Sequence, residues 1–464
     1  MPRCAMTAGV LILMSAIAGA RATESAPPIF RAEPCCTLCP RAADPSVYVS
    51  RFMRDQRVTV QGTEDWLFRT EVDLATDFTV DTKVYEDLAR LVRALKARGT
   101  QVLLLDLPRR GLLTADKLRP AERAGYDAKM ALANYRLALQ RFREAGFIVP
   151  DYGRLVDEPD GTDYYFRRDG HWTPDGARRT AELIAETIRA MPVYEQLRKT
   201  NFMTKRVGQV VHPGVLSIAA SQICGGSFAS EFVSGYSTSP SRTFPFGDEP
   251  VPDVALVGTS FSAVPAYHFS GFLQEKLQTD VLNVSISGGN FDGAMTQYLP
   301  SDTFQLSPPK LLIWEFAHTQ IAAASRTQMR RLVPLADNGC LGKQTLLTND
   351  VQISPGAEFE EVLFNGGDER VDAPSRELRV DLQFENPSVT EILGEAWYLD
   401  GKHEVVTVRM NDYTRANGRF VLELNREPDY SHQPLIDFRV HVVTPLKQAT
   451  ALSAKLCRSI DHVG

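Results

Sequence analysis

Beyond its N-terminal end, the chain of 464 residues lacks any long apolar run, and it also lacks internal repeats and tracts of low complexity. A membrane-spanning helix needs about 20 consecutive apolar residues, so a protein with several membrane spans is excluded. The apolar and charged fractions are ordinary, which excludes a disordered or fibrous chain. The length fits two or three globular domains.

An excess of positive charge is also missing, because the net charge is −6 at pH 7. Such a chain exerts no long-range attraction on nucleic acid, and we expect no nucleic-acid partner. An acidic polymer could bind only in a local basic groove. The sequence contains no nucleotide-binding or coenzyme A-binding motif, and we expect neither a cofactor nor a bound metal.

The N-terminal residues predict a secretory signal peptide. A mostly apolar run from Ala5 to Ala18 follows Arg3 and precedes a small-residue motif at 20–22. The alternative is a membrane anchor, but the run is shorter than the roughly 20 residues of a spanning helix. We expect residues 1–22 to be removed on export to the periplasm.

Cysteine is scarce, and six cysteines follow the predicted signal peptide, an even number in a chain bound for an oxidising compartment. Cys340 and Cys457 bracket one stretch of distinct composition, and we predict a disulfide between them. Cys224 then needs a partner from the N-terminal cluster Cys35, Cys36 and Cys39, among which we favour Cys39. A zinc site on the spacing Cys36-x-x-Cys39 is the alternative, but two further clustered ligands are missing from its neighbourhood.

Helical and strand patterns alternate between residues 84 and 314. Apolar positions recur at helical spacing from Val84 to Leu95, and a second helix is predicted from Asp127 to Ala145. Short apolar runs typical of buried parallel strands occupy 102–105, 147–149, 254–257, 281–284 and 311–314. This alternation predicts an α/β domain with a doubly wound parallel sheet, which we assign to residues 23–335.

The pattern changes to short alternating strands after about residue 336. Apolar and polar residues alternate from Leu378 to Phe384, as in a half-buried strand. The runs 397–399 and 405–408 flank Asp400-Gly401 and predict a hairpin, and 420–422 and 438–443 add further strands. Residues 336–464 therefore predict a smaller all-β sandwich.

A candidate catalytic pair lies in the segment Asp169-Gly-His171, directly before a helix that Thr173 can cap. An Asp two residues from a His can accept the Nδ1 proton and leave Nε2 free as a general base. The alternatives are half of a metal site and a purely structural capping loop.

The candidate nucleophile is Ser260, because the apolar run 254–257 ends in Gly258-Thr259-Ser260 and ligands bind beyond the carboxyl ends of parallel strands. A serine is a weak nucleophile until a base takes its proton, so Ser260 depends on His171. Taken alone, this motif is more often an ordinary turn. Ser262 is the rival nucleophile, and the rival bases are His268 and His318.

A tetrahedral intermediate needs amide donors that face its oxyanion. The Ser260 amide is the first candidate, and the loop 287–290 supplies Gly289 and Asn290 as further candidates. This loop follows the predicted strand 281–284 and could equally be a simple turn.

Four sequence motifs together resemble one family. They are "GTEDWLF", "DGHWTPDGA" from Asp169, "GTSFS" from Gly258 and "LLIWEF", which ends at Phe316. The chain resembles the periplasmic alginate O-acetyltransferases of the AlgX and AlgJ type, whose catalytic domain is similar to an SGNH hydrolase. The β-rich end looks like a carbohydrate-binding module, which favours the AlgX branch.

The resemblance implies transfer of acetyl groups to mannuronate hydroxyls of alginate. It implies that Ser260 becomes acetylated, that His171 acts as base and acid, and that Asp169 orients His171. The disulfide pattern of the family matches Cys39–Cys224 and Cys340–Cys457. The expected partners are alginate, a membrane-associated acetyl donor and proteins of an export complex, and we expect a monomer.

A polyuronate binder needs cations and sugar-stacking rings, and several residues are candidates. In the α/β domain these are Arg167, Arg168, His318, Arg326, Arg330 and Arg331, which could equally form a solvated face. In the β-domain they are Trp397, Tyr398, Lys402 and Arg409. Alternating strands bury about half of such side chains.

Two other functions are open at this point. A polysaccharide O-acetyl esterase would use the same acyl-enzyme and pass the acetyl group to water. A non-catalytic polysaccharide-binding scaffold of an exopolysaccharide export complex would need no acyl-enzyme.

Overall fold

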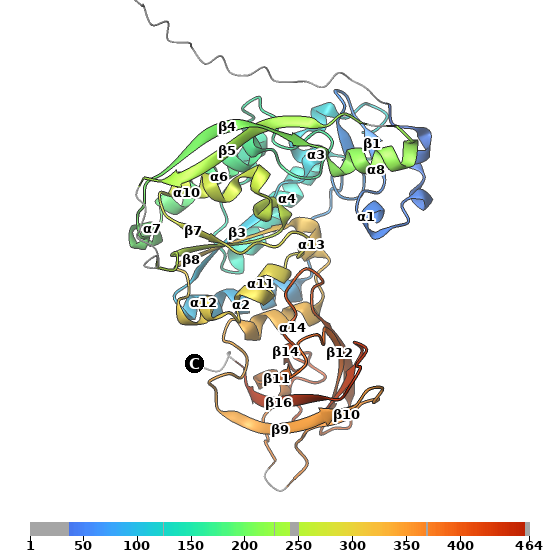
Figure 1. Ribbon diagram of the computed structural model, residues 1–464, viewed down its shortest axis with the longest axis vertical. Helices are drawn as coiled ribbons and strands as arrows, with labels where there is room; N and C mark the ends of the chain where they lie inside the picture. Colours follow the sequence, from blue (N-terminus) through green and yellow to red (C-terminus); the bar gives the residue numbers. More distant parts are fainter. Residues whose placement is uncertain (1–36, 124, 227, 242–249, 368–369, 460–464) are drawn as a thin grey trace, which may run out of the picture.

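The computed structural model describes residues 37–123, 125–226, 228–241, 250–367 and 370–459. The predicted signal peptide, Cys35 and Cys36 lie outside the described residues. An α/β part lies above an all-β part in Figure 1. In the described ranges, no helix combines the length and the apolar character needed to cross a membrane.

A four-stranded parallel sheet forms the centre of the α/β part, in the order β3-β8-β6-β7. Its strands are β3 (Gln101–Leu107), β6 (Val254–Val257), β7 (Val281–Asn283) and β8 (Leu311–Ala317). Four of the predicted strands are thereby confirmed, and the parallel arrangement buries them on both faces.

The predicted strand at 147–149 is only a single bridge between Ile148 and Leu103. The reason is Pro150, which has no amide hydrogen to continue the pairing. The Leu104 carbonyl instead accepts a hydrogen bond of 2.7 Å from the Tyr152 hydroxyl.

Helices cover both faces of the sheet, as a doubly wound domain requires. In Figure 1, α4 (Ala128–Glu144), α6 (Pro174–Arg189) and α10 (Phe269–Leu277) lie above the sheet. Below it lie α2 (Thr82–Ala97), α11 (Gly293–Tyr298), α12 (Asp302–Leu306) and α14 (Arg326–Leu335). The two predicted helices correspond to α2 and α4.

An antiparallel hairpin of β4 (Phe202–His212) and β5 (Glu231–Pro240) lies over α10 and was not predicted from the sequence. Most of its side chains are exposed or half-buried, so it has no continuous apolar run. The helix α8 (Val215–Cys224) connects the two strands. A disulfide links Cys224 to Cys39, which fixes α8 to the N-terminal segment.

The N-terminal segment consists of short elements beside α8. They are η1 (Pro40–Ala43), η2 (Pro45–Val47), α1 (Arg51–Arg54), β1 (Thr59–Gln61) and β2 (Leu67–Arg69). The strands β1 and β2 pair with each other, and the segment packs on α8 through η1.

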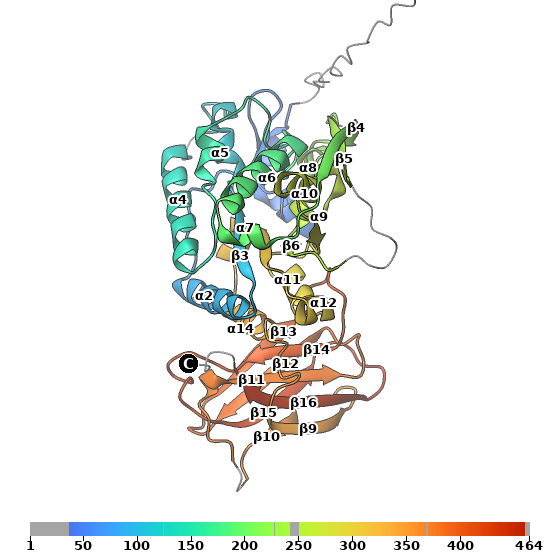
Figure 2. The same ribbon diagram turned by 90° about the vertical axis from the view of Figure 1, so that its left-hand side faces the viewer.

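The C-terminal part is a β-sandwich of two antiparallel sheets, in the orders β10-β15-β12-β13 and β14-β11-β16-β9 (Figure 2). A disulfide joins Cys340 to Cys457 in the last strand. The strands are β9 (Thr345–Ile353), β10 (Glu360–Phe364), β11 (Leu378–Phe384), β12 (Glu391–Tyr398), β13 (His403–Arg409), β14 (Arg419–Glu423), β15 (Leu435–Val442) and β16 (Thr450–Arg458).

Buried ion pairs connect the two parts through α2 and α14. Arg90 of α2 binds Glu423 of β14 with two hydrogen bonds of 2.9 and 2.6 Å. Arg330 of α14 binds Glu404 of β13 at 2.8 and 3.0 Å. We keep the domain boundary at 335/336 as a proposal, since α14 contacts α2 on one side and β14 on the other.

Candidate active site

The loop before α6 holds Asp169 and His171 in contact. Thr173 caps α6 by accepting a hydrogen bond of 3.1 Å from the Gly176 amide, and Pro174 is the first helical residue. Asp169 Oδ1 lies 2.6 Å from His171 Nδ1 and also accepts the His171 amide at 2.8 Å. The loop therefore fixes the orientation of the imidazole ring.

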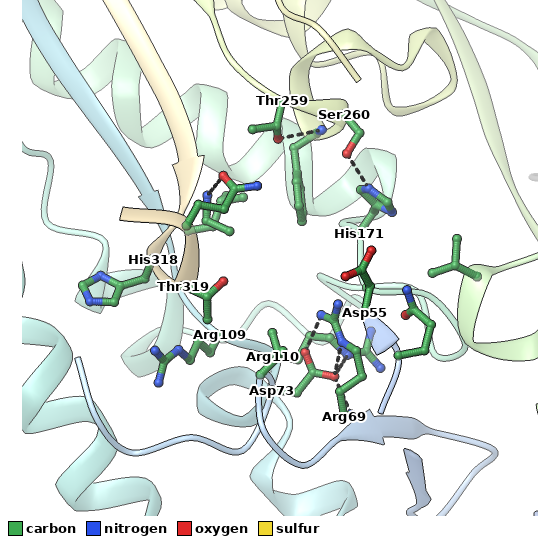
Figure 3. Close-up of a pocket in the computed structure, with 18 of the residues that line it drawn as sticks. Asp55, Arg69, Asp73, Arg109, Arg110, His171, Thr259, Ser260, His318 and Thr319 are labelled. Carbon is green, nitrogen blue, oxygen red and sulfur yellow. Dashed lines mark hydrogen bonds and ion pairs between the residues drawn. The ribbon is translucent and has the colours of Figure 1, made fainter. Parts of the chain in front are cut away.

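Ser260 completes a hydrogen-bonded chain of three side chains. It is the first residue of α9 (Ser260–Ala263), at the carboxyl end of β6, and its Oγ lies 2.7 Å from His171 Nε2 (Figure 3). The structure thus brings together the three residues that the sequence nominated from positions about 90 apart. Such a chain can move a proton from Ser260 to His171 while the carboxylate stabilises the imidazolium.

The second oxygen of Asp169 is occupied as well. Oδ2 lies 2.9 Å from His212 Nε2, at the end of β4, and accepts the Val215 amide of α8 at 2.8 Å. Burial alone raises the pKa of Asp169, but the hydrogen bonds with His171 and His212 outweigh it and hold the pKa well below its usual value. His212 was not predicted as part of the site, because its partner Asp169 lies 43 residues away in the sequence.

Arg110 holds the Asp169 loop from below. Its buried guanidinium donates to the backbone carbonyls of Phe166, Arg167 and Asp169, and to that of Leu67. Burial lowers the pKa of Arg110. Its place follows from the fold, because Arg110 comes three residues after the end of β3, at the same sheet edge as Ser260.

Glu315 of β8 supports the serine turn. Its fully buried carboxylate accepts the Thr259 amide at 2.7 Å, the Thr259 hydroxyl at 2.8 Å and the Ser262 hydroxyl at 2.9 Å. Burial raises the pKa of Glu315, and these hydrogen bonds oppose the shift. Gly258 is required here, since a Cβ at this position would lie 2.4 Å from a carboxylate oxygen of Glu315.

The rival nucleophile and bases have other partners. Ser262 is buried and bonded to Glu315. His318 is buried, with Nδ1 at 2.7 Å from Asp106 and Nε2 at 3.0 Å from the Phe78 carbonyl. His268 lies 2.7 Å from the Thr238 hydroxyl. None of the three contacts Ser260 or His171 through a hydrogen bond among the described residues.

Ser260 and His171 line a cleft of about 570 Å³ (Figure 3). Six arginines and three carboxylates line it, so the cleft carries an excess of positive charge in a chain that is negative overall. The arginines are Arg51, Arg54, Arg57, Arg69, Arg109 and Arg110. None of the six was predicted from the sequence, and the first three come from the N-terminal segment.

The loop after β7 reaches the same cleft with Gly288 and Asn290. The prediction of Gly289 as an oxyanion donor is wrong, because this residue is buried and its amide donates to the Ile286 carbonyl in a turn. Within the described ranges, the backbone amides of Ser260 and Asn290 donate to no protein group. Both amides are therefore able to bind a ligand oxygen.

Most of the predicted sugar contacts in the α/β part are corrected by the structure. Arg168 is buried near Asp65. Arg167 forms an ion pair of 2.9 Å with Asp163, and neither arginine lines the cleft. His318 lies in the cleft wall with both ring nitrogens occupied. These side chains contribute to the loop structure, and their polar atoms are used within the protein.

The candidates in the β-domain divide in a similar way. The prediction of Tyr398 as a sugar-stacking residue is wrong, because its ring is buried in the sandwich core and its hydroxyl donates to Glu404 at 2.9 Å. Trp397 stacks on His403, and Lys402 donates to the Asp429 carbonyl, so neither lines the cleft. Arg409 is different, because it is 60% exposed and lines a second groove.

This second groove lies along the seam of the two parts and shares Arg51 and Asn290 with the first cleft. Arg330 and Arg331 of α14 line it together with Arg409, whereas Arg326 binds Asp87 and Glu427 beside it. The two grooves therefore adjoin at these residues, with Ser260 in the lining of the first and the edge strand β13 in the lining of the second.

Two family models match the chain. One describes an SGNH hydrolase-like domain of the acetyltransferase AlgX and matches residues 59–318. The other describes a C-terminal carbohydrate-binding module and matches residues 339–464. The parallel-sheet domain and the sandwich correspond to these two descriptions.

Relatives of similar length match as well. The alginate biosynthesis protein AlgX of Pseudomonas aeruginosa is 37% identical over 98% of this chain and 95% of its own length. AlgX of Azotobacter vinelandii is 37% identical over 96% of this chain and 93% of its own length. The solved structure of Pseudomonas aeruginosa AlgX has a TM-score of 0.81 and covers 91% of this chain and 99% of that chain.

Fold and site together define an SGNH-hydrolase-like protein with an appended carbohydrate-binding module. Within that class, the chain belongs to the AlgX family.

Proposed function

We propose that this chain is a periplasmic O-acetyltransferase that moves acetyl groups onto mannuronate hydroxyls of alginate through an acetylated Ser260. The observation that carries the proposal is the hydrogen-bonded chain Ser260–His171–Asp169 at the floor of an arginine-lined cleft. The membership in a family of alginate biosynthesis proteins supports the choice of polymer.

The reaction has two balanced steps. Ser260 Oγ attacks the acetyl carbonyl of the donor, its proton passes to His171 Nε2, and the leaving group departs with that proton. A mannuronate hydroxyl then attacks the acetyl-serine, gives its proton to His171, and Ser260 regains a proton as the acetyl ester of the sugar forms. Asp169 stays ionised and stabilises the imidazolium in both steps.

The amides of Ser260 and Asn290 are the proposed oxyanion donors. They are the free backbone donors named above at the serine turn and at the loop after β7. The Asn290 side chain is a further donor, because its Oδ1 accepts the Phe291 amide at 2.9 Å and its Nδ2 donates to no protein group among the described residues. Each such donor lowers the barrier by stabilising the developing negative charge.

Alginate fits the charge of the two grooves. A polymer of uronic acids carries one carboxylate on each sugar, and arginine binds carboxylates through two parallel hydrogen bonds. The grooves are lined by Arg51, Arg57, Arg109 and Arg409, and the exposed ion pairs of Arg51 and Arg409 with Asp412 and of Arg57 with Glu71 would be exchanged for contacts with the polymer. The β-sandwich therefore extends the binding surface beyond the reacting sugar.

Export and partners are part of the same proposal. Two disulfides suit an oxidising compartment such as the periplasm. A membrane-associated protein would hand over the acetyl group, and export-complex proteins would present the polymer to a monomeric enzyme.

The test compares the wild type with Ser260→Ala. Both proteins are incubated with an aryl acetate as donor and mannuronate oligomers as acceptor, and mass spectrometry detects the acetylated oligomers. We expect acetylation by the wild type only, while both proteins still bind the oligomers. Acetylation by Ser260→Ala would contradict the proposal, and release of acetate without oligomer acetylation would identify an esterase instead.

A further inference from the structure

The β13–β14 connection of the sandwich lies against the active-site loop of the α/β domain. This connection, residues 410–418, extends away from its own sheet toward α11. The Arg415 amide donates to the side chain of Gln297 in α11 at 3.0 Å. Tyr413 even lines the cleft that contains Ser260. A segment of the C-terminal sandwich therefore forms part of the cleft that contains Ser260.

Asn411 makes the most specific contact. Its Nδ2 donates a hydrogen bond of 2.8 Å to the carbonyl oxygen of Gly289, which also accepts the Gly293 amide at 2.8 Å. That carbonyl belongs to the peptide group whose amide is the Asn290 N–H. In a trans peptide the two groups point in opposite directions, so a hold on the carbonyl also sets the direction of the Asn290 amide.

Tyr413 covers the neighbouring residue. Gly288 has a φ of +78°, and a Cβ built on it would lie 2.7 Å from the Tyr413 ring. The ring therefore packs directly on the backbone of the loop. Arg51 approaches the other side of this connection, with an ion pair of 3.1 Å to Asp412 and its guanidinium 5.9 Å from the Tyr413 ring.

The contacts of Asn411 are fixed from within its own loop. Its Oδ1 accepts the Tyr413 amide at 3.0 Å, and its carbonyl accepts the Thr414 hydroxyl at 2.8 Å. The donor atom is therefore already oriented when it meets Gly289. Preorganised donors and dipoles around an oxyanion are a main source of catalytic rate.

We infer that Asn411 is a positioning residue for acyl transfer, through which the β-sandwich holds the Asn290 amide in place as an oxyanion donor. The inference rests on the proposed function, because it needs Ser260 to form a tetrahedral intermediate. It assigns the sandwich a role in the chemical step in addition to polymer binding.

The test uses the substitution Asn411→Asp in the full chain. The carboxylate still accepts the Tyr413 amide, so the loop keeps its turn, but it has no donor for the Gly289 carbonyl. We expect kcat for a small acetyl ester to fall roughly 10-fold with little change in KM, because an oxyanion donor is worth about 10²- to 10³-fold when fully lost and the Gly293 amide still binds the Gly289 carbonyl in the variant. A small ester removes polymer binding from the measurement.

Asn417→Asp is the matched control. Asn417 lies in the same connection and accepts the Arg419 amide through Oδ1, which an aspartate also does. We expect this variant to keep the wild-type kcat. Hydrogen exchange of the peptide that contains residues 286–291 gives a second measurement, and it should increase in Asn411→Asp but not in Asn417→Asp.

Labelling with a fluorophosphonate separates the two hypotheses. Suppose that the wild type is labelled at Ser260, and that Asn411→Asp is labelled and hydrolyses the small ester as fast as the wild type. The positioning role is then wrong while the proposed function stands. If Ser260 of the wild type is not labelled at all, the proposed function is wrong, and the inference falls with it.

Discussion

The side chain of Asp169 accepts four hydrogen bonds in a position where the residue is only 1% exposed to solvent. His171 supplies two of them, and His212 and the Val215 amide supply the others. A carboxylate with so many donors remains ionised to a pH well below its ordinary titration range, which matches the lowered pKa. Its orientation is fixed at the same time, because both oxygens are held.

We predict that His212→Phe makes the enzyme more sensitive to acid. The phenyl ring can keep the stacking on Phe166, where the ring centroids are 4.0 Å apart, but it provides no donor for Asp169. One of the two side-chain bonds that lower the pKa of Asp169 is then lost, and burial moves the pKa upward. The acidic limb of the stability–pH profile, followed by acid unfolding, should shift to higher pH by roughly half a unit to one unit.

The sign follows from linkage. A carboxylate with a lowered pKa stabilises the native state above its unfolded pKa, and this contribution disappears as the pH falls through the native pKa. When the native pKa rises, the loss begins at a higher pH. His212→Gln retains a donor and is the control, and an identical acidic limb in His212→Phe and the wild type would show that His212 has no such effect.

At the scale of elements, the turn between β6 and α9 depends on a carboxylate from β8. Glu315 accepts three hydrogen bonds from this turn in a fully buried position. The contact joins the nucleophile to the strand that neighbours β6 in the sheet. The position of Ser260 is therefore determined by two strands.

We predict that Glu315→Gln lowers both stability and reactivity. A glutamine has one acceptor oxygen, so at least one of the three donors of the turn loses its partner. The free energy of unfolding should fall by about 1–3 kcal/mol, and the labelling of Ser260 by a fluorophosphonate should become slower. Thermal unfolding and labelling kinetics measure the two effects, with the exposed Glu182→Gln as the control. Unchanged labelling at Ser260 would count against this role.

The sequence predicted the elements that short local patterns encode. The strands β3, β6, β7 and β8 are apolar runs, and β11 to β15 follow from alternation or hairpin patterns. The pair Asp169 and His171 was visible because only Gly170 separates them, and Ser260 because it follows a buried strand. The hairpin β4–β5 was not visible, since its half-exposed strands resemble a loop.

Long-range contacts set the limit on the predicted site. His212, Arg51 and Asn411 reach the site from a hairpin, the N-terminal segment and the sandwich, and no local pattern connects them with Ser260. Tyr398 shows the opposite error. The period of two in β12 could have assigned it to the buried face, beside Ile392 and Ala396, instead of the sugar-binding surface.

At the scale of the whole molecule, buried charges join the two domains. Glu423 binds Arg90 and also accepts the Ser459 hydroxyl at 2.5 Å. Arg90 in turn contacts Asp87, whose pKa is raised by burial. Removal of Glu423 would take two hydrogen bonds from the buried Arg90, which would keep its contact with Asp87, and the loss of one partner from a buried ion-pair network is costly.

We predict that Glu423→Ala destabilises the contact between the domains by about 3–5 kcal/mol. Differential scanning calorimetry should then resolve two unfolding transitions, or a single transition at a clearly lower temperature. Glu427→Ala is the control, because its ion pairs with Lys83 and Arg326 are partly exposed and contribute about 0–1 kcal/mol. An equal effect of the two substitutions would contradict the prediction.

The helix α8 contacts Asp169 at its first residue and is held by a disulfide at its last residue. Its first residue, Val215, donates its amide to Asp169, and its last residue, Cys224, is bonded to Cys39. Before the bond forms, only noncovalent contacts hold this helix against the N-terminal segment. Oxidation of this cysteine pair therefore restrains the helix whose first amide binds Asp169. For the exported enzyme proposed above, this link predicts that the Asp169 contact is fully restrained only after the chain reaches a compartment where the disulfide forms.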